Sequence, residues 1–164
     1  MHPIPREIVS KVVDKMDKGE PFMCYVVIPM FPEGDPTSTP SQEILHWQHL
    51  TMEAMYLRIG EAIKERGLDK KPTDFLMFFC LGKQETLAEV PDGLELPADG
   101  TPASLARQTL RHPIYVHSKL MIVDDEYIVV GTANVNQRSM GGSRDTEVAV
   151  AAKQPVHDAD HRGE

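Results

Sequence analysis

Apolar positions along the chain recur with two different periods, and these predict alternating helices and strands. Residues 5–18 and 39–66 place apolar side chains at every third or fourth position, as in a helix with one buried face. Residues 22–30 and 75–81 are short continuous apolar runs, which are typical of buried strands. The order helix, strand, helix, strand therefore predicts an α/β fold with a mixed β-sheet flanked by helices.

Local signals mark the ends of both predicted helices. Residues 39–42, Thr-Pro-Ser-Gln, match a capping box with Thr39 as the cap. Gly19 and Gly67 follow the last periodic positions and predict the two carboxyl ends. The apolar stripe of the longer helix consists of Ile44, Trp47, Met52, Met55, Ile59 and Ile63. For Trp47, Met52 and Met55 we expect packing in the core rather than contact with lipid.

The segment from 114 to 130 combines strand-like runs with polar residues in a fixed order. Its apolar positions predict two strands, covered on both faces, that are joined by a tight turn at 124–126. His117, Lys119 and Asp124 follow the pattern H-x-K-x4-D. Because His117 and Lys119 are two positions apart, both side chains would emerge on the same face of a strand. A buried imidazole and ammonium are costly unless an anion or a carboxylate meets them.

The remaining segments predict one domain with an insert and a tail. Residues 83–112 are polar, acidic and rich in proline and glycine, and we expect a surface loop or a partly disordered insert there. A last strand is expected at 146–152 and a frayed tail at 153–164, so that the domain spans 1–152. Calcium binding by the acidic insert and metal binding by His157, Asp158, Asp160 and His161 are the less favoured alternatives.

Composition limits the kinds of binding partner and the cellular compartment that we expect for this protein. A formal net charge of −8 argues against a general nucleic-acid surface, although it allows one basic pocket. Cys24 and Cys80 both lie in apolar runs, and we expect them to be buried free thiols in a reducing compartment. The chain opens without an apolar leader and contains no run long enough to span a bilayer. We expect a cytoplasmic protein whose membrane contact is peripheral.

The polar residues in and after the segment 114–130 form a candidate site for phosphoryl transfer. His117 can act as a nucleophile or as a general acid and base, and Lys119 can meet a phosphate oxygen. Neutral donors follow the second strand: Thr132, Asn134 and Asn136. Glu147 or Asp145 could accept the Nδ1 proton of His117. These groups favour chemistry through a phosphohistidine without a metal. The alternatives are a satisfied core histidine, a lysine reaching the sheet edge and an aspartate that only begins the turn.

These motifs resemble the phospholipase D superfamily, and most of all the C-terminal catalytic half of the plant alpha type. The resemblance extends over most of the chain, through YVVIPMFPEG at 25–34, ILHWQHLTMEAMY at 44–56, DFLMFFCLG at 74–82 and the segment 114–150. It implies one half of a two-lobed catalytic fold. It also implies hydrolysis of a glycerophospholipid, such as phosphatidylcholine, to phosphatidic acid and the free head group.

The resemblance also implies a role for each site residue. His117 would protonate the leaving head group and later activate water, because the family's N-terminal histidine usually forms the phosphohistidine. Lys119, Thr132 and Asn134 would contact the phosphate, with Thr132 standing where the family usually has serine. Glu147 would orient His117. Asp124 belongs to the catalytic signature, but we expect it to hydrogen-bond near the turn as a structural residue.

The chain departs from the family in having one H-x-K-x4-D motif where the family uses two. No other histidine is followed by lysine two residues later. We therefore expect a half-site that is inactive alone, and that needs the missing N-terminal half or a second copy of this chain. Its other partners would be a phospholipid and a membrane surface, with no nucleic acid. No cofactor is expected in this segment, because the family's calcium dependence would reside in an absent N-terminal domain. The alternatives are a homodimeric phosphodiesterase or nuclease and a non-catalytic truncated fragment.

Overall fold

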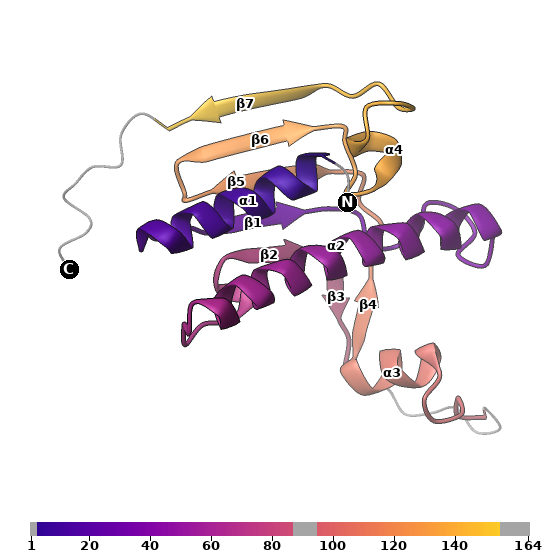
Figure 1. Ribbon diagram of the computed structural model, residues 1–164. Helices are drawn as coiled ribbons and strands as arrows, with labels where there is room; N and C mark the ends of the chain where they lie inside the picture. Colours follow the sequence, from indigo (N-terminus) through magenta and orange to yellow (C-terminus); the bar gives the residue numbers. More distant parts are fainter. Residues whose placement is uncertain (1–2, 87–94, 155–164) are drawn as a thin grey trace.

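A five-stranded mixed sheet carries the fold of the computed structural model, which describes residues 3–86 and 95–154. The strands lie in the order β2-β1-β5-β6-β7, and only β1 and β2 are parallel. They span Cys24–Val27 (β1), Leu76–Phe79 (β2), Lys119–Val123 (β5), Tyr127–Gly131 (β6) and Ala149–Lys153 (β7). The described helices are α1 (Pro3–Lys18), α2 (Thr39–Glu65), the 3-10 turn η1 (Pro72–Asp74), α3 (Pro102–Thr109) and α4 (Gln137–Met140). The predicted α/β fold with a mixed, helix-flanked sheet is confirmed (Figure 1).

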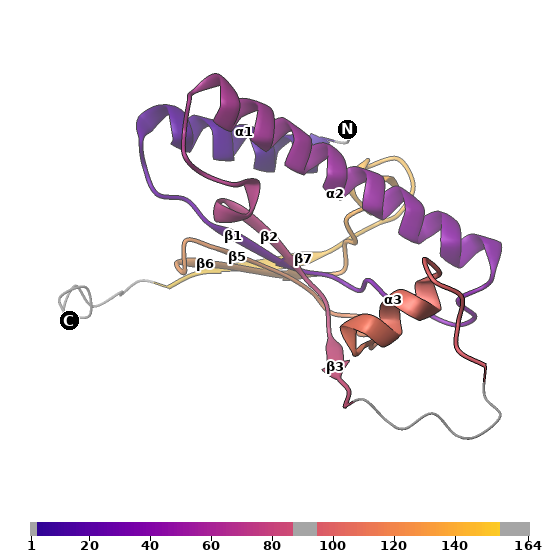
Figure 2. The ribbon, with the colours of Figure 1, turned by 90° about the horizontal axis from the view of Figure 1, so that it is seen from below.

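Helices α1 and α2 lie side by side on one face of the sheet and enclose the core (Figure 2). The buried positions of α1 follow the predicted helical period: Val9, Val12 and Met16. Met55 and Ile59 of α2 and Leu76 of β2 are at most 1% exposed. Burying each such side chain stabilises the fold by about 1.5–3 kcal/mol. Gly19 and Gly67, with φ of 63° and 60°, follow the two helices as predicted.

The opposite face of the sheet is left open by all described elements, so the expectation of strands covered on both faces is wrong. Since Cys24 and Val26 point toward the helices, their neighbours on β1 point to the open face. Strand register aligns two apolar rows there: Phe79, Val27, Leu120, Val130 and Val150, and beside them Met77, Tyr25, Ile122, Ile128 and Ala152. Val130 is 52% exposed and Val150 is 72% exposed. Both α1 and α2 lie on the same side of the sheet, so they cover only one of its faces (Figure 2).

The N-terminal part of α2 extends past the sheet, which corrects the predicted apolar stripe. Trp47 is 57% exposed and does not pack in the core as expected, whereas Met55 does. Ile44, at the start of the same stripe, is 38% exposed. A helix of 27 residues is about 40 Å long, whereas strands of four or five residues are about 13–17 Å long. The capping box is also wrong, because the cap is Ser38 and its side chain makes no capping hydrogen bond.

The insert is more ordered than the sequence predicted. Strands β3 (Gly82–Gln84) and β4 (Arg111–Pro113) form an antiparallel ribbon, and α3 packs beside β4. The Thr101 side chain caps α3 by accepting a hydrogen bond from the Ser104 amide at 3.2 Å. Residues 87–94, which include part of the acidic insert considered for calcium binding, lie outside the described part.

Further expectations are corrected at the cysteines and the tail. Cys24 is buried, and burial raises the pKa of its thiol to about 12, but Cys80 is exposed because β2 ends before it. Lys153 ends β7, and the Gln154 amide donates to the Glu126 carbonyl at 2.8 Å, so the tail begins later than predicted. Residues 155–164, with the metal alternative at 157–161, lie outside the described residues. None of the described helices is long and apolar enough to span a bilayer.

Gly131 permits the close approach of β6 and β7, and its replacement provides a stability test. A Cβ there would lie 2.8 Å from the Val148 carbonyl oxygen and 2.9 Å from the Ala149 Cβ. These atoms belong to a paired strand and cannot move aside cheaply. We expect Gly131→Ala to lower the free energy of unfolding by about 1–3 kcal/mol in urea denaturation.

Gly60→Ala is the matched control, because Gly60 lies inside α2 and its added Cβ would lie 3.7 Å from Pro72 Cγ. That variant should keep its stability or gain up to about 1 kcal/mol. Equal stability of the two variants would contradict the predicted contact between β6 and β7.

Candidate active site

Lys119 and His117 meet at the beginning of β5. Lys119 is the first residue of the strand and is 6% exposed. Its Nζ donates to the His117 backbone carbonyl oxygen at 2.9 Å. His117 precedes the strand, and its side chain is exposed. The predicted strand from residue 114 therefore begins later, and strand alternation does not place the two side chains on one face.

A pocket of about 350 Å³ opens beside the imidazole of His117. Its walls come from the loop after β1, the first turns of α2, the segment before β5 and Asn134 after β6. Phe31, Glu33 and Tyr115 also line it. His117 therefore borders an opening large enough for a small polar group, and four segments of the chain build that opening.

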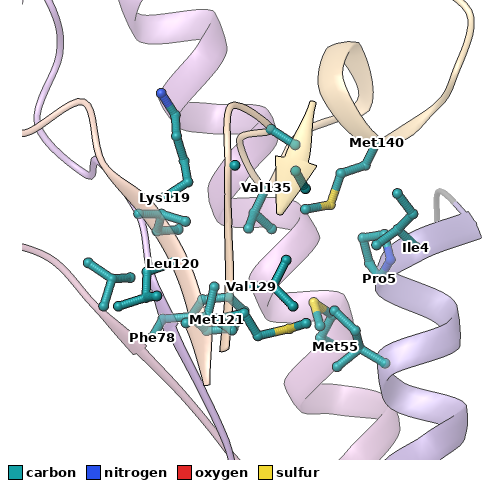
Figure 3. Close-up of a pocket in the computed structure, with 17 residues that line it drawn as sticks. Ile4, Pro5, Met55, Phe78, Lys119, Leu120, Met121, Val129, Val135 and Met140 are labelled. Atoms are coloured by element: carbon teal, nitrogen blue, oxygen red, sulfur yellow. The ribbon is translucent and has the colours of Figure 1, made fainter. Parts of the chain in front are cut away.

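The stem of Lys119 lines a second, apolar cavity of about 190 Å³ under the two helices. Figure 3 shows its ammonium pointing away from the apolar side chains of Met55, Met121 and Val135. Burial lowers the pKa of Lys119, and the charge of Glu147 and then that of Glu33 oppose this change. A bound anion would also favour the charged ammonium, because it would replace the lost water.

Glu147 and Asp145 hold other partners than the imidazole. The Thr132 hydroxyl donates to Glu147 Oε2, and it accepts from the Val148 amide at 3.0 Å. Arg138 donates to both oxygens of Asp145 at 3.2 Å. The expected hydrogen bond from His117 to either carboxylate is therefore absent here, because β6–β7 pairing brings Glu147 to Thr132 instead.

In the part of the chain that the structure describes, the imidazole of His117 makes a ring contact and no side-chain hydrogen bond. Its ring lies 6.0 Å from that of Tyr115, with 27° between the planes. The imidazole can therefore still take a partner at either nitrogen.

The two asparagines after β6 have different surroundings. Asn134 lines the pocket with His117, and its buried Oδ1 has no hydrogen-bond partner among residues 3–86 and 95–154. An unpaired buried polar atom costs about 1–3 kcal/mol, so a ligand or a partner chain that meets it would bind favourably. Asn136 instead caps α4 by accepting from the Ser139 amide at 3.1 Å. Asn134 is thus available to a ligand, whereas Asn136 is structural.

Asp124 lies at the far end of β5, about 17 Å from Lys119 at the usual strand rise. Its Oδ1 accepts from the Met23 amide at 2.7 Å, and its own amide donates to the Met23 carbonyl at 2.9 Å. Asp124 and Asp125 have φ of 52° and 56°, as in a primed hairpin turn. These contacts hold the turn to the segment before β1 and keep Asp124 out of the pocket.

The whole chain, residues 1–164, matches the profile of the family described as "PLDc: Phospholipase D". The protein belongs to the phospholipase D family. It is similar to "Phospholipase D alpha 2" of Brassica oleracea var. capitata, at 50% identity over 158 residues, which are 96% of this chain and 20% of the relative. It is 52% identical to "Phospholipase D alpha 2" of Oryza sativa subsp. japonica over 158 residues, 96% of this chain and 19% of the relative. "Phospholipase D alpha 3" of Arabidopsis thaliana is 52% identical over 156 residues, 94% of this chain and 19% of the relative.

These matches confirm the resemblance to plant phospholipases D of the alpha type. The chain spans about a fifth of the length of these relatives.

The structure adds Glu33 and Tyr115 to the candidate site of this phospholipase D family member. The Tyr115 hydroxyl donates to Glu33 Oε2 at 2.9 Å, across 82 positions of sequence. Position 115 could have been noticed because it lies two residues before His117. Nothing in the sequence near Glu33 indicates that the loop carrying it reaches the site.

Replacing Asp124 tests its structural role. Asp124→Ala removes the hydrogen bond from the Met23 amide. It also leaves alanine, which has no side-chain acceptor, in a left-handed backbone conformation that alanine disfavours. We expect the free energy of unfolding to fall by about 2 kcal/mol in urea denaturation. Asp124→Asn keeps an acceptor and tolerates this conformation, so it should lose under about 1 kcal/mol. Similar losses in both variants would contradict the role of the hydrogen bond.

Lys119→Met separates stability from anion binding, because methionine keeps the buried stem and removes the ammonium. Near neutral pH we expect the free energy of unfolding to rise or to change by under about 1 kcal/mol. Binding of inorganic phosphate, measured by calorimetry, should weaken at least about tenfold. Lys70→Met, at an exposed position, is the control. Unchanged phosphate binding in Lys119→Met would remove Lys119 from the site.

The pH dependence of stability has a definite sign. Between the lowered pKa of Lys119 and its ordinary value of 10.5, the unfolded chain binds more protons than the folded chain. The Lys119 contribution to the unfolding free energy therefore rises with pH in that window, and Lys119→Met should lack this rise.

Proposed function

We propose that this chain supplies one half of a phospholipase D active site. The site would act on glycerophospholipids of the phosphatidylcholine type and release phosphatidic acid and the free head group. The observation that carries the proposal is that His117, whose side chain is exposed, lines a pocket together with Asn134, whose buried Oδ1 has no hydrogen-bond partner among the described residues. Lys119 adds a partly desolvated cation beside them.

His117 acts as the acid and base in this proposal. It donates a proton to the oxygen of the leaving head group, and it later takes a proton from the water that attacks the phosphohistidine on the second motif. A single imidazole cannot be the nucleophile and the leaving-group acid in the same step. A second histidine must therefore face His117 across the phosphate.

Lys119 and Asn134 hold the phosphate oxygens in this proposal, and Asn134 does so through its Nδ2 amide, because its Oδ1 can only accept. The bond to the His117 carbonyl uses one of the three ammonium protons of Lys119, so two remain for a ligand. Thr132 is engaged with Glu147, and the pair keeps the segment that carries Asn134 against β7. In this arrangement Thr132 positions Asn134. An orienting role of Glu147 toward His117 would require that carboxylate to leave Thr132.

The open face of the sheet supports the need for a second half. Single-chain soluble proteins rarely expose an apolar surface of this extent, and two apolar rows cross the whole sheet here. We propose that the missing motif comes from the N-terminal half of a longer chain, or from a second copy of this chain. The enzyme would then work in the cytoplasm and touch the membrane surface only to reach its phospholipid.

The roles assigned to this chain are the proton transfers of His117 and the phosphate contacts of Lys119 and Asn134. Among residues 3–86 and 95–154, no group of three or more histidine, cysteine or acidic side chains could hold a metal ion. We propose that calcium dependence belongs to parts of the longer relatives outside this segment.

Complementation tests the proposal. The chain is mixed with an N-terminal half of a plant phospholipase D alpha that carries the other motif, and choline release from phosphatidylcholine vesicles is measured. We expect release in the mixture only. His117→Asn should lower it at least about 100-fold. His112→Asn, at an exposed position on β4 outside the pocket, should leave it unchanged.

Dilution of the chain alone separates the alternatives. Activity that falls with the square of the concentration would indicate a homodimeric phosphodiesterase. Activity proportional to concentration at high dilution, or a mixture that keeps its activity after His117→Asn, would overturn the half-site. A folded chain that stays inactive in every mixture would be non-catalytic.

A further inference from the structure

A carboxylate shares the pocket of His117 with groups suited to an anion. Glu33 Oε2 accepts from the Tyr115 hydroxyl at 2.9 Å, and within the described residues Glu33 forms no ion pair. A phosphate beside His117 and Asn134 would be repelled by this negative charge. The repulsion becomes an attraction if the ligand carries a positive group on the side of Glu33.

Aromatic rings line the same part of the pocket. Phe31 and Tyr115 both contribute to its walls, and the Tyr115 ring stacks on His117 with 27° between the planes. Alkylammonium cations are attracted to the faces of aromatic rings, and this attraction is strongest where water is excluded. A quaternary ammonium has no N–H to donate, so rings together with a nearby carboxylate are well suited to hold it.

The loop that carries Glu33 and Phe31 is tied to the helix beside it. Gln48 of α2 is 3% exposed, and its Nε2 donates to the Pro29 carbonyl at 3.1 Å. Pro29 and Pro32 restrict the backbone on either side of Phe31. The Tyr115 hydroxyl uses one oxygen of Glu33, and Oε1 makes no hydrogen bond within the described residues. The carboxylate is therefore held in place with one oxygen free.

We propose that Glu33, Tyr115 and Phe31 form a subsite for the alkylammonium group of a zwitterionic head group. The ammonium lies against the rings and Glu33, and the phosphate lies at His117, Lys119 and Asn134. This inference rests on the proposed function, from which it takes the position of the phosphate. It makes Glu33 a specificity-determining residue, since a head group with a neutral or negative end would gain nothing there.

Binding to the whole chain tests the subsite without requiring catalysis. Phosphocholine, glycerol phosphate, inorganic phosphate and choline chloride are titrated by calorimetry or NMR. We expect phosphocholine to bind about three- to tenfold more tightly than glycerol phosphate. Glu33→Gln should abolish that preference while leaving inorganic phosphate bound at least as tightly. Tyr115→Phe keeps the ring and frees the carboxylate, so it should reduce the preference only about two- to threefold.

Glu43→Gln is the matched control. Glu43 is exposed on α2 and is not part of this pocket, and the variant removes the same charge. It should leave all four affinities unchanged. If Glu33→Gln changes the affinities for phosphocholine and for inorganic phosphate equally, or changes neither affinity, the subsite is overturned.

The ligand panel distinguishes the two proposals. If inorganic phosphate binds through Lys119 and choline compounds bind no better, the subsite fails and the proposed phosphate position stands. If choline binds in a manner sensitive to Glu33→Gln and no phosphate binds, the subsite stands and the proposed phosphate position fails.

Discussion

One hydrogen bond, from the Lys119 ammonium to the His117 carbonyl, joins the covered sheet to the segment that carries the imidazole. Lys119 as a whole residue is only 6% exposed, and its stem lines an apolar cavity. Removing the charged ammonium from water costs free energy, and this desolvation lowers the pKa of Lys119. An anion bound beside the ammonium would offset this desolvation cost, which therefore favours the binding of an anionic ligand.

The proposed chemistry and the described fold both call for a second half. In the proposed mechanism a second histidine is needed, because one imidazole cannot serve both sides of the phosphate. No element among residues 3–86 and 95–154 covers the second face of the sheet, where Val130 and Val150 lie exposed in apolar rows. Both deficits would be met by one event, the docking of another half. The length of the alpha-type relatives, about five times the matched segment, agrees with this reading.

Charges of both signs lie at or beside the pocket of His117. Lys119, whose ammonium is bonded to the His117 carbonyl, and the Nδ2 amide of Asn134 suit a phosphate, while Glu33 and the rings of Phe31 and Tyr115 suit a cation. A formal net charge of −8 for the whole chain hides this local pattern. A zwitterion satisfies both ends at once, whereas a simple anion meets one repulsive group. Selectivity can thus arise from a single carboxylate without any change at the reacting atoms.

The sequence by itself determined the features that depend only on neighbouring residues. Helical spacing located α1 and α2, the glycines at 19 and 67 marked their ends, and the motif from His117 to Asp124 identified the family. These signals are local, because a helical period or a left-handed φ depends on only a few adjacent positions.

Only the tertiary structure decided which residues far apart in the sequence come into contact. Trp47 is exposed because α2 is longer than the strands beneath it. Glu147 meets Thr132, and not His117, because the β6–β7 register places it there. Glu33 reaches Tyr115 from 82 positions away, through the folding of a loop that no local pattern specifies. Contacts between distant residues depend on strand order and register, and short-range sequence patterns do not carry that information.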